Sequence, residues 1–225
     1  MRFRDRSDAG RQLGSELEAL DLLGSDTIVL GLPRGGVPVA AEVALIGGCA
    51  IDVMVVRKLG VPGHEEVAMG AIASGGFRVM NSEIVRTLAI DQGDIETVAA
   101  RERIELERRE IAYRGVAATP VLSDRPVVLV DDGIATGASM RVAVLAAREG
   151  GARSITVAVP VAPASAGIEF EGITDAFVAV ATPSTFGAVG YWYEDFRQTT
   201  DDEVREALSL VDQRRQGGSD SGSIP

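Results

Sequence analysis

The second half of the chain alternates short aliphatic segments with segments of helical pattern, and this alternation limits the fold more than any other feature. Short buried strands that alternate with helices are typical of a parallel sheet covered by helices on both faces. The sequence therefore predicts an α/β protein. The expected strands are 26–32, 50–56, 127–130, 154–160 and 176–181, and helical patterns lie at 37–46 and 137–149 and in "APASAGIEF".

The segment of about 62–120 is too long for a simple crossover between two strands. It contains "VAMGAIASGGFRVM", which is typical of a hairpin turning at Gly75 and Gly76, and then the long charged helix "IETVAARERIELERREIAYR". We interpret this segment as a flap followed by a helical insertion within one domain, residues 1–212.

Two further boundaries follow from composition near the C-terminus. Residues of about 182–200 contain "GYWYEDF" and are expected to form a small hood over the end of the sheet. The closing helix in "DDEVREALSLV" is expected to be capped by Asp201 or Asp202. The tail 213–225 is polar and rich in Gly and Ser, so we expect it to be disordered.

Composition excludes several classes of function. The net charge of −11 argues against general nucleic-acid binding, and the longest uncharged run, 176–193, contains Pro and Gly and does not resemble a membrane span. The N-terminus is too charged for a secretory signal. The single cysteine, Cys49, lies in an apolar context, where we expect it in the core. A cytoplasmic protein is the simplest interpretation.

The stretch "VVLVDDGIATGASM", 127–140, is the most informative motif. A turn of small residues between a strand and a helix directs several backbone N–H groups at one point, where the helix dipole also favours an anion such as phosphate. Thr136 and Ser139 add hydroxyl donors. The paired acids, Asp131 and Asp132, suit ribose hydroxyls or a cation carried with the ligand. The motif lacks the lysine of a P-loop and the spacing of a dinucleotide fingerprint.

Two other unusual loops follow strands, "PRGG" after the first and "RKLGVPGHEE" after the second. Ligands of parallel α/β sheets bind at the carboxyl ends of the strands. We therefore expect these two loops and "DDGIATGAS" to converge at one edge of the sheet. His64 lies in the second loop; a single histidine does not make a metal site, and a solvated loop residue is the favoured interpretation.

The stretch "VVLVDDGIATGAS" resembles the ribose-phosphate signature of type I phosphoribosyltransferases. The resemblance implies a parallel sheet flanked by helices, with a flap and a hood. It also implies that Asp131 and Asp132 bind the ribose hydroxyls of phosphoribosyl pyrophosphate. Gly133 departs from the family pattern, in which an aliphatic residue is common. The residues that would surround the 5′-phosphate are Ala135, Thr136, Gly137, Ala138 and Ser139.

The other two loops fit the same resemblance. "LPRGGVP" is similar to the pyrophosphate loop of the family, in which Arg34, Gly35 and Gly36 would present backbone amides and a guanidinium to the leaving group. "VVRKLGVP" is similar to the basic pair that precedes the catalytic flap. Lys58, the only lysine of the chain, would contact pyrophosphate, whereas Arg57 either does the same or braces the loop through a carboxylate.

The whole-chain pattern, including "AVGYWYEDF", is similar to a poorly characterised bacterial branch of predicted phosphoribosyltransferases. The resemblance implies a homodimer in nucleotide metabolism that transfers a phosphoribosyl group to a small nitrogenous acceptor and releases pyrophosphate. Mg²⁺ would arrive with the donor, and the protein would reach it only through ribose or water at Asp131 and Asp132. Trp192 either stacks on the acceptor or packs in the hood.

Two alternatives to an enzyme remain open at this point. One is a non-catalytic sensor of phosphoribosyl pyrophosphate, and the other is a generic nucleotide-binding module. The acceptor is also open, because Ala135 stands where 6-oxopurine enzymes carry an acid, and no lysine follows Lys58. The sequence identifies no residue for the acid–base step.

Overall fold

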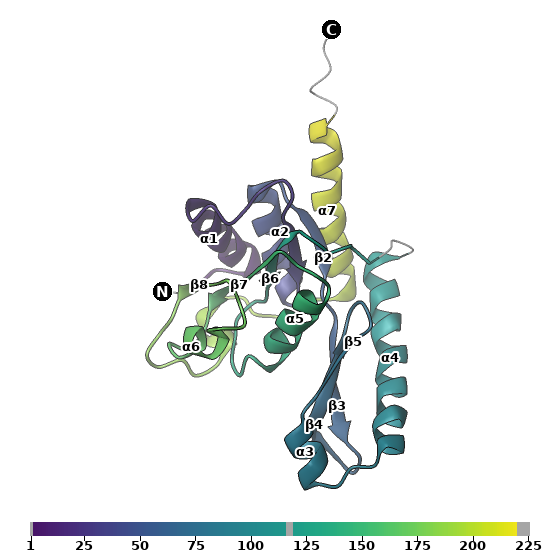
Figure 1. Ribbon diagram of the computed structural model, residues 1–225. Helices are drawn as coiled ribbons and strands as arrows, with labels where there is room; N and C mark the ends of the chain where they lie inside the picture. The colour runs from purple at the N-terminus through teal and green to yellow at the C-terminus, as the bar shows by residue number, and fades with distance from the viewer. Residues whose placement is uncertain (1, 116–118, 220–225) are drawn as a thin grey trace.

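The computed structural model describes residues 2–115 and 119–219, and a parallel sheet of five strands lies at its centre (Figure 1). The strand order is β2–β1–β6–β7–β8, and every neighbouring pair is parallel. The strands agree with the sequence prediction except at 50–56, and the α/β class is confirmed. Their bounds are β1 (Ile28–Gly31), β2 (Ala50–Val53), β6 (Pro126–Val130), β7 (Ser154–Val161) and β8 (Ala176–Ala181).

Helices cover both faces of this sheet because the aliphatic strands project apolar side chains to both sides. In β6, Val128 and Val130 pack on one face with residues of α1, α2 and α7, whereas Val127 and Leu129 pack on the other with residues of α5 and α6. The helices on the first face are α1 (Arg6–Ala19), α2 (Gly36–Gly47) and α7 (Asp201–Ser219), and those on the second are α5 (Ala138–Glu149) and α6 (Ala166–Phe170).

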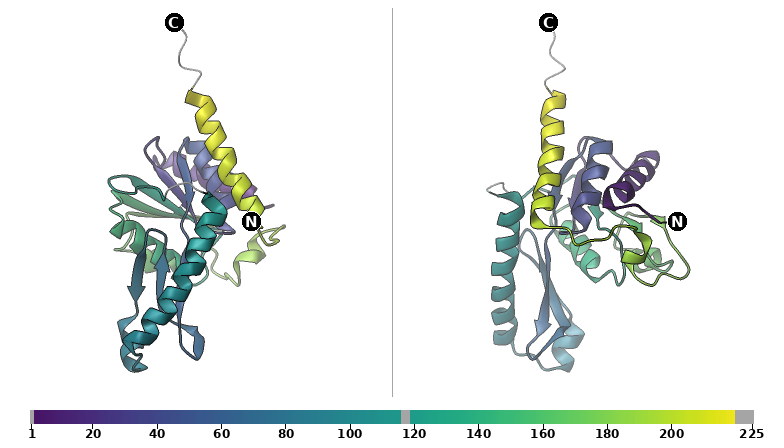
Figure 2. Two further views of the ribbon diagram at one scale, coloured as in Figure 1. Left: turned by 90° about the vertical axis from the view of Figure 1, so that its right-hand side faces the viewer. Right: turned by 180° about the vertical axis from the view of Figure 1, so that it is seen from behind.

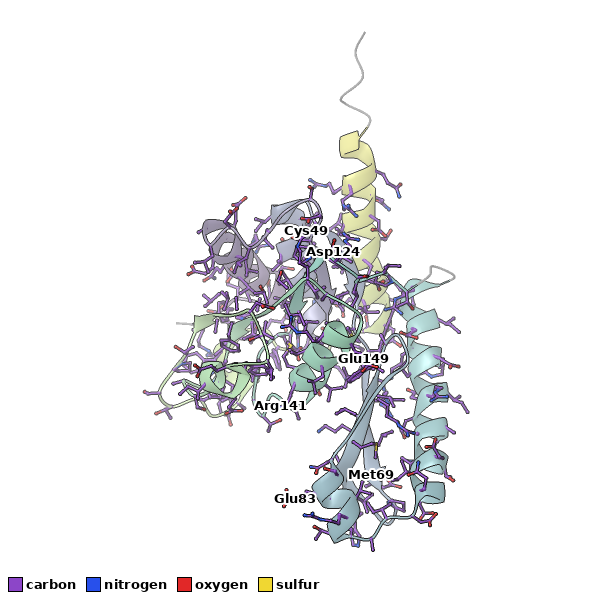
Figure 3. The ribbon with its side chains drawn as sticks, viewed as in Figure 1. Cys49, Met69, Glu83, Asp124, Arg141 and Glu149 are labelled. Carbon is purple, nitrogen blue, oxygen red and sulfur yellow. The ribbon has the colours of Figure 1, made fainter. Side chains whose placement is uncertain are left out.

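A second sheet extends away from the first and forms the lower part of the molecule in Figure 1. It is antiparallel, in the order β3–β4–β5, and α4 runs along it. The β4–β5 turn contains Gly75 and Gly76 at φ 84° and 82°, as predicted. Met69 of β4 is fully buried in the core shared with α4 (Figure 3). The bounds are β3 (Val56–Val61), β4 (His64–Ala73), β5 (Phe77–Met80), α3 (Ser82–Thr87) and α4 (Gln92–Arg114).

The expected strand at 50–56 is two strands of different sheets. β2 ends at Val53 and β3 begins at Val56, so the flap begins earlier than residue 62, and Arg57 and Lys58 lie on a strand instead of in a loop. A continuous aliphatic run does not show where the chain bends between two sheets, because both strands bury the same kinds of residue.

The chain near the C-terminus also differs from expectation. A short 3₁₀ helix, η1 (Val189–Trp192), precedes α7, and the N-cap of α7 is Thr200 instead of Asp201 or Asp202. The Thr200 hydroxyl accepts from the Glu203 amide, and the Glu203 carboxylate accepts from the Thr200 amide, which is a capping box.

α7 continues as a helix to Ser219, although disorder was expected from residue 213 (Figure 2). Gln and Arg at 213–216 are good helix formers, so they extend a helix that Val211 has already anchored in the core. Residues 220–225 of the expected tail lie outside the described residues. Within the described part of the chain, no helix combines the length and apolar character needed to cross a membrane.

Candidate active site

The loop after β6 leads directly into α5 at the carboxyl edge of the parallel sheet. Gly137 is the N-cap of α5 and adopts φ +68°, a left-handed conformation that favours glycine. The first-turn amides of an α-helix have no partner within the helix, and the helix dipole is positive at this end. The loop therefore presents donors of the type that a phosphate group needs, with Thr136 exposed and Ser139 half-buried beside them.

The loop after β1 packs on the acidic pair with no room for side chains. A Cβ atom at Gly35 would overlap Oδ2 of Asp132, and one at Gly36 would lie 2.8 Å from the Cα atom of Asp131. The Pro33–Arg34 peptide of this loop is cis. The Gly36 amide donates to the Leu32 carbonyl at 3.0 Å, so Gly36 packs against the acids and does not present a free donor. The predicted convergence of these two loops is thus observed.

The two carboxylates lie in an environment that opposes their ionisation. Burial, with the neighbouring Asp132 charge, raises the pKa of Asp131 well above its ordinary value, and burial likewise raises the pKa of Asp132. Asp131 Oδ1 accepts from the Asp132 amide at 2.9 Å. Perturbed acids in contact with a donor-rich loop are typical of a functional site.

The positive charge of Arg6 offsets the cost of burying the Asp132 carboxylate. Arg6 was not among the predicted site residues. Its Nε and Nη2 atoms lie 2.9 Å and 2.8 Å from Asp132 Oδ2. The guanidinium lies 4.1 Å from the centre of the Phe196 ring and donates through Nη1 to the Arg197 carbonyl. Nothing in the local sequence around Arg6 indicates this contact, because its partners lie 126 and 191 residues away.

The hood contacts the acidic loop through Tyr193 and Val189. The Tyr193 hydroxyl donates to the Asp132 carbonyl at 2.6 Å, and burial raises the pKa of the phenol, so it keeps its proton. A Cβ atom at Gly133 would lie 2.6 Å from Val189 Cγ1. Gly133 therefore lies where the hood approaches the loop and leaves no room for a larger side chain. Trp192 donates its indole N–H to the Phe186 carbonyl at 3.0 Å, a contact that favours packing in the hood.

Arg34 points towards the start of α7. Its Nη1 atom lies 3.7 Å from Oδ1 of Asp201, and the same oxygen accepts from the Tyr113 hydroxyl at 3.2 Å. Both partners of the ion pair are partly exposed, so a phosphate can compete for the guanidinium. Asp201 is the second residue of this region that the sequence did not assign to the site.

Arg57, Lys58 and Ser139 line one cleft of about 340 Å³ between the flap and α5. Arg57 donates through Nε and Nη2 to Glu102 of α4, with the shorter distance 2.6 Å, so it braces the flap through a carboxylate, one of the two predicted roles. Lys58 is exposed. The structure thus brings the flap cation and the hydroxyl of the phosphate loop together.

No group of three or more acidic, histidine or cysteine side chains that fits a metal ion occurs among residues 2–115 and 119–219.

Comparison with known proteins identifies similar chains. A model described as the phosphoribosyl transferase domain matches residues 11–172. Proteins of two Mycobacterium tuberculosis strains, each named as a candidate phosphoribosyl transferase, are 45% identical over 222 residues. These residues make up 99% of this chain but 49% of each relative, so the chain spans about half of their length.

A solved structure is similar over nearly the whole chain. The crystal structure of TT1426 from Thermus thermophilus is 44% identical, with a TM-score of 0.82, and the match covers 94% of this chain and 99% of that one.

Proposed function

Because the chain belongs to the phosphoribosyl transferase domain family, we propose that it transfers the 5-phosphoribosyl group of phosphoribosyl pyrophosphate to a nitrogenous acceptor. In this reaction the bond between ribose C1 and the pyrophosphate oxygen breaks, a bond between C1 and the acceptor nitrogen forms, and pyrophosphate leaves. The observation that carries the proposal is the packing of Gly35 and Gly36 on Asp132 and Asp131. Because this packing places the loop after β1 beside the loop after β6, it supports binding of the pyrophosphate end and the ribose-phosphate end of one donor molecule at adjacent loops.

Each part of the site has a role suited to this reaction. The start of α5 and the hydroxyls of Thr136 and Ser139 hold the 5′-phosphate, with Ala135, Gly137 and Ala138 small enough for the backbone to approach it. Asp131 and Asp132 accept hydrogen bonds from the ribose hydroxyls. Arg34 and Lys58 stabilise the negative charge that grows on the departing pyrophosphate.

When bound together with the donor, Mg²⁺ would supply further charge neutralisation at the pyrophosphate group that Arg34 and Lys58 are proposed to contact. The chain's own contribution is to position the donor and to orient its reacting carbon towards the acceptor. Trp192 has two roles open to it, stacking on the acceptor or packing in the hood. Its indole N–H is bonded to the Phe186 carbonyl, and this bond leaves the faces of the ring free for either role.

The proposal is tested by pyrophosphate release in the presence of Mg²⁺, the donor and a panel of purines, pyrimidines and other nitrogenous acceptors. Release that depends on one acceptor supports a transferase. Tight donor binding without release across the panel favours the sensor, and no donor binding at all refutes both.

Lys58→Ala is expected to lower the turnover number by about 10²-fold, the usual loss when one transition-state donor is removed, while donor affinity changes less. Lys58→Arg should recover part of the rate because it keeps the charge. Arg103→Ala is the matched control, since Arg103 is an exposed cation of the flap helix α4 outside the cleft. Equal losses of rate and affinity in Lys58→Ala would remove Lys58 from the proposed role.

A further inference from the structure

The Asp132 carboxylate is held by one of its two oxygens. Arg6 Nε donates to Oδ2 at 2.9 Å, Nη2 lies 2.8 Å from the same oxygen in an ion pair, and Gly35 packs against that oxygen. Within the described part of the chain no side-chain contact engages Oδ1, so this oxygen is the one we assign to a ligand. We propose that Arg6 is a positioning residue that orients the Asp132 carboxylate for a ribose hydroxyl of the donor. The inference rests on the proposed function and adds a residue to it.

Arg6 is itself fixed on several sides. Its guanidinium stacks on Phe196 at 4.1 Å, and its Nη1 atom donates to the Arg197 carbonyl at 2.8 Å. Phe196 in turn packs on Tyr193, with ring centres 4.9 Å apart, and Tyr193 donates to the Asp132 carbonyl. Asp132 is therefore held at its side chain by Arg6 and at its backbone by Tyr193.

The Arg6–Asp132 pair differs from the surface ion pairs of the same helix. The side chains of Arg6 and Asp132 are only 13% and 15% exposed, whereas those of Arg11 and Glu42 are 47% and 23% exposed. A planar guanidinium fixed by stacking holds a carboxylate in one orientation, which a mobile lysine does not. Removing Arg6 would leave Asp132 buried beside Asp131 with no compensating charge, and the two carboxylates would repel each other.

Arg6, Tyr193 and Phe196 all lie outside residues 11–172, the part that matches the family model. The three residues that hold Asp132 thus come from the segments before and after the part that matches the family model, whereas Asp132 belongs to a loop within that part.

The test compares two ligands that occupy different parts of the same site. Ribose 5-phosphate carries the hydroxyls that Asp132 is proposed to bind, whereas Mg²⁺-pyrophosphate carries none. We expect Arg6→Gln to weaken binding of ribose 5-phosphate about tenfold or more, as measured by calorimetry, with pyrophosphate affinity within about twofold of wild type. Arg6→Lys should recover part of the loss. Arg11→Gln, on the same helix, is the matched control and should bind both ligands normally.

A double-mutant cycle with Asp132→Asn separates positioning from general support of the fold. If Arg6 acts through Asp132, Arg6→Gln should add little to the loss already caused by Asp132→Asn. Circular dichroism checks that each variant is folded. If Arg6→Gln does not fold, Arg6→Lys carries the comparison, with a smaller selective loss expected.

The outcomes separate this inference from the proposed function. Wild-type protein that binds neither ligand, nor the donor, would refute the proposed function and the inference with it. Normal wild-type binding together with equal weakening of both ligands, or of neither, in the Arg6 variants would overturn the inference alone. Additive losses in the cycle would also overturn it.

Discussion

At Gly35 the loop after β1 lies against the Asp132 carboxylate so closely that even a methyl group has no space. Gly35→Ala is therefore expected to displace the carboxylate and to weaken donor binding by at least about tenfold, with a loss of stability of about 1–3 kcal/mol from overpacking. Calorimetry and urea unfolding measure the two effects.

Gly217→Ala is the control for this substitution, because nothing lies within 4 Å of a Cβ atom at Gly217. It should leave donor affinity unchanged and slightly favour α7, since alanine is the better helix former. Unchanged donor affinity in Gly35→Ala would show that the two loops separate more easily than their packing indicates.

The buried carboxyl group of Asp131 makes the stability of the folded protein depend on pH. Its folded pKa is raised above the ordinary value of 3.8, mainly by burial, so the folded state binds this proton more tightly than the unfolded state. The carboxyl therefore favours folding at low pH and costs stability as the pH rises from about 3.8 through the raised folded value.

Asp131→Asn removes this cost and keeps an oxygen that accepts from the Asp132 amide. We expect the variant to be more stable than wild type at pH 7, by on the order of 1 kcal/mol, and to lose the advantage as the pH falls. Donor binding should be weakened. Urea unfolding at several pH values measures the difference, and an advantage that grows towards low pH would contradict the assignment.

At the scale of single elements, the start of α7 shows how one helix end serves both stability and the site. Thr200 and Glu203 form the capping box, which leaves Asp201 at the first helical position with its carboxylate close to Arg34 and Tyr113. The cap determines where the helix begins, and thereby where the carboxylate beside Arg34 lies.

Thr200→Ala is expected to lower the free energy of unfolding by about 1 kcal/mol, the usual loss for an N-cap threonine. Asp202→Asn should change it by less than about 0.5 kcal/mol, because this side chain is exposed and its ion pair with Arg205 is a surface pair. Chemical denaturation distinguishes the two. A larger loss of unfolding free energy in Asp202→Asn than in Thr200→Ala would indicate that Asp202, one of the two residues first predicted, is the N-cap.

At the scale of the whole molecule, the N-terminal segment packs against the hood beside the site. Phe3 exchanges backbone hydrogen bonds with the hood, through Trp192 and Glu194, and its ring packs on Tyr193 with centres 5.4 Å apart. The N-terminal segment is thus part of the hood, although it contains none of the residues that the motifs predicted.

Phe3→Ala is therefore expected to destabilise the protein by about 3–5 kcal/mol, as for other fully buried aromatic residues, and to loosen the hood. Trp192, the only tryptophan, reports this directly: its fluorescence emission should shift to the red as its surroundings admit water. Leu20→Ala is the control, since Leu20 is 53% exposed at the end of α1. An unchanged emission spectrum in Phe3→Ala would contradict the coupling.

The sequence alone determined the features that depend on neighbours in the chain. The alternation of aliphatic and helical segments predicted the parallel sheet, and Gly75 and Gly76 predicted the flap hairpin; both are confirmed. The motif from Val127 to Met140 indicated the family, which the comparisons confirm. The roles of the individual site residues stay predictions. The sequence from Thr200 to Glu203 also matches the S/T-x-x-E pattern of a capping box. The prediction instead assigned the N-cap to the neighbouring acids, Asp201 or Asp202.

Only the tertiary structure decided which distant groups share the site. Arg6 reaches Asp132 across 126 residues, and Phe3 reaches Tyr193 from the opposite end of the chain. The bend between β2 and β3 could not be predicted either, because both strands belong to one aliphatic run. For this reason Lys58 was expected in a loop, whereas it lies on β3. Periodicity and turn chemistry describe a residue's own segment, whereas a contact between segments depends on how the layers pack, and no local pattern records that.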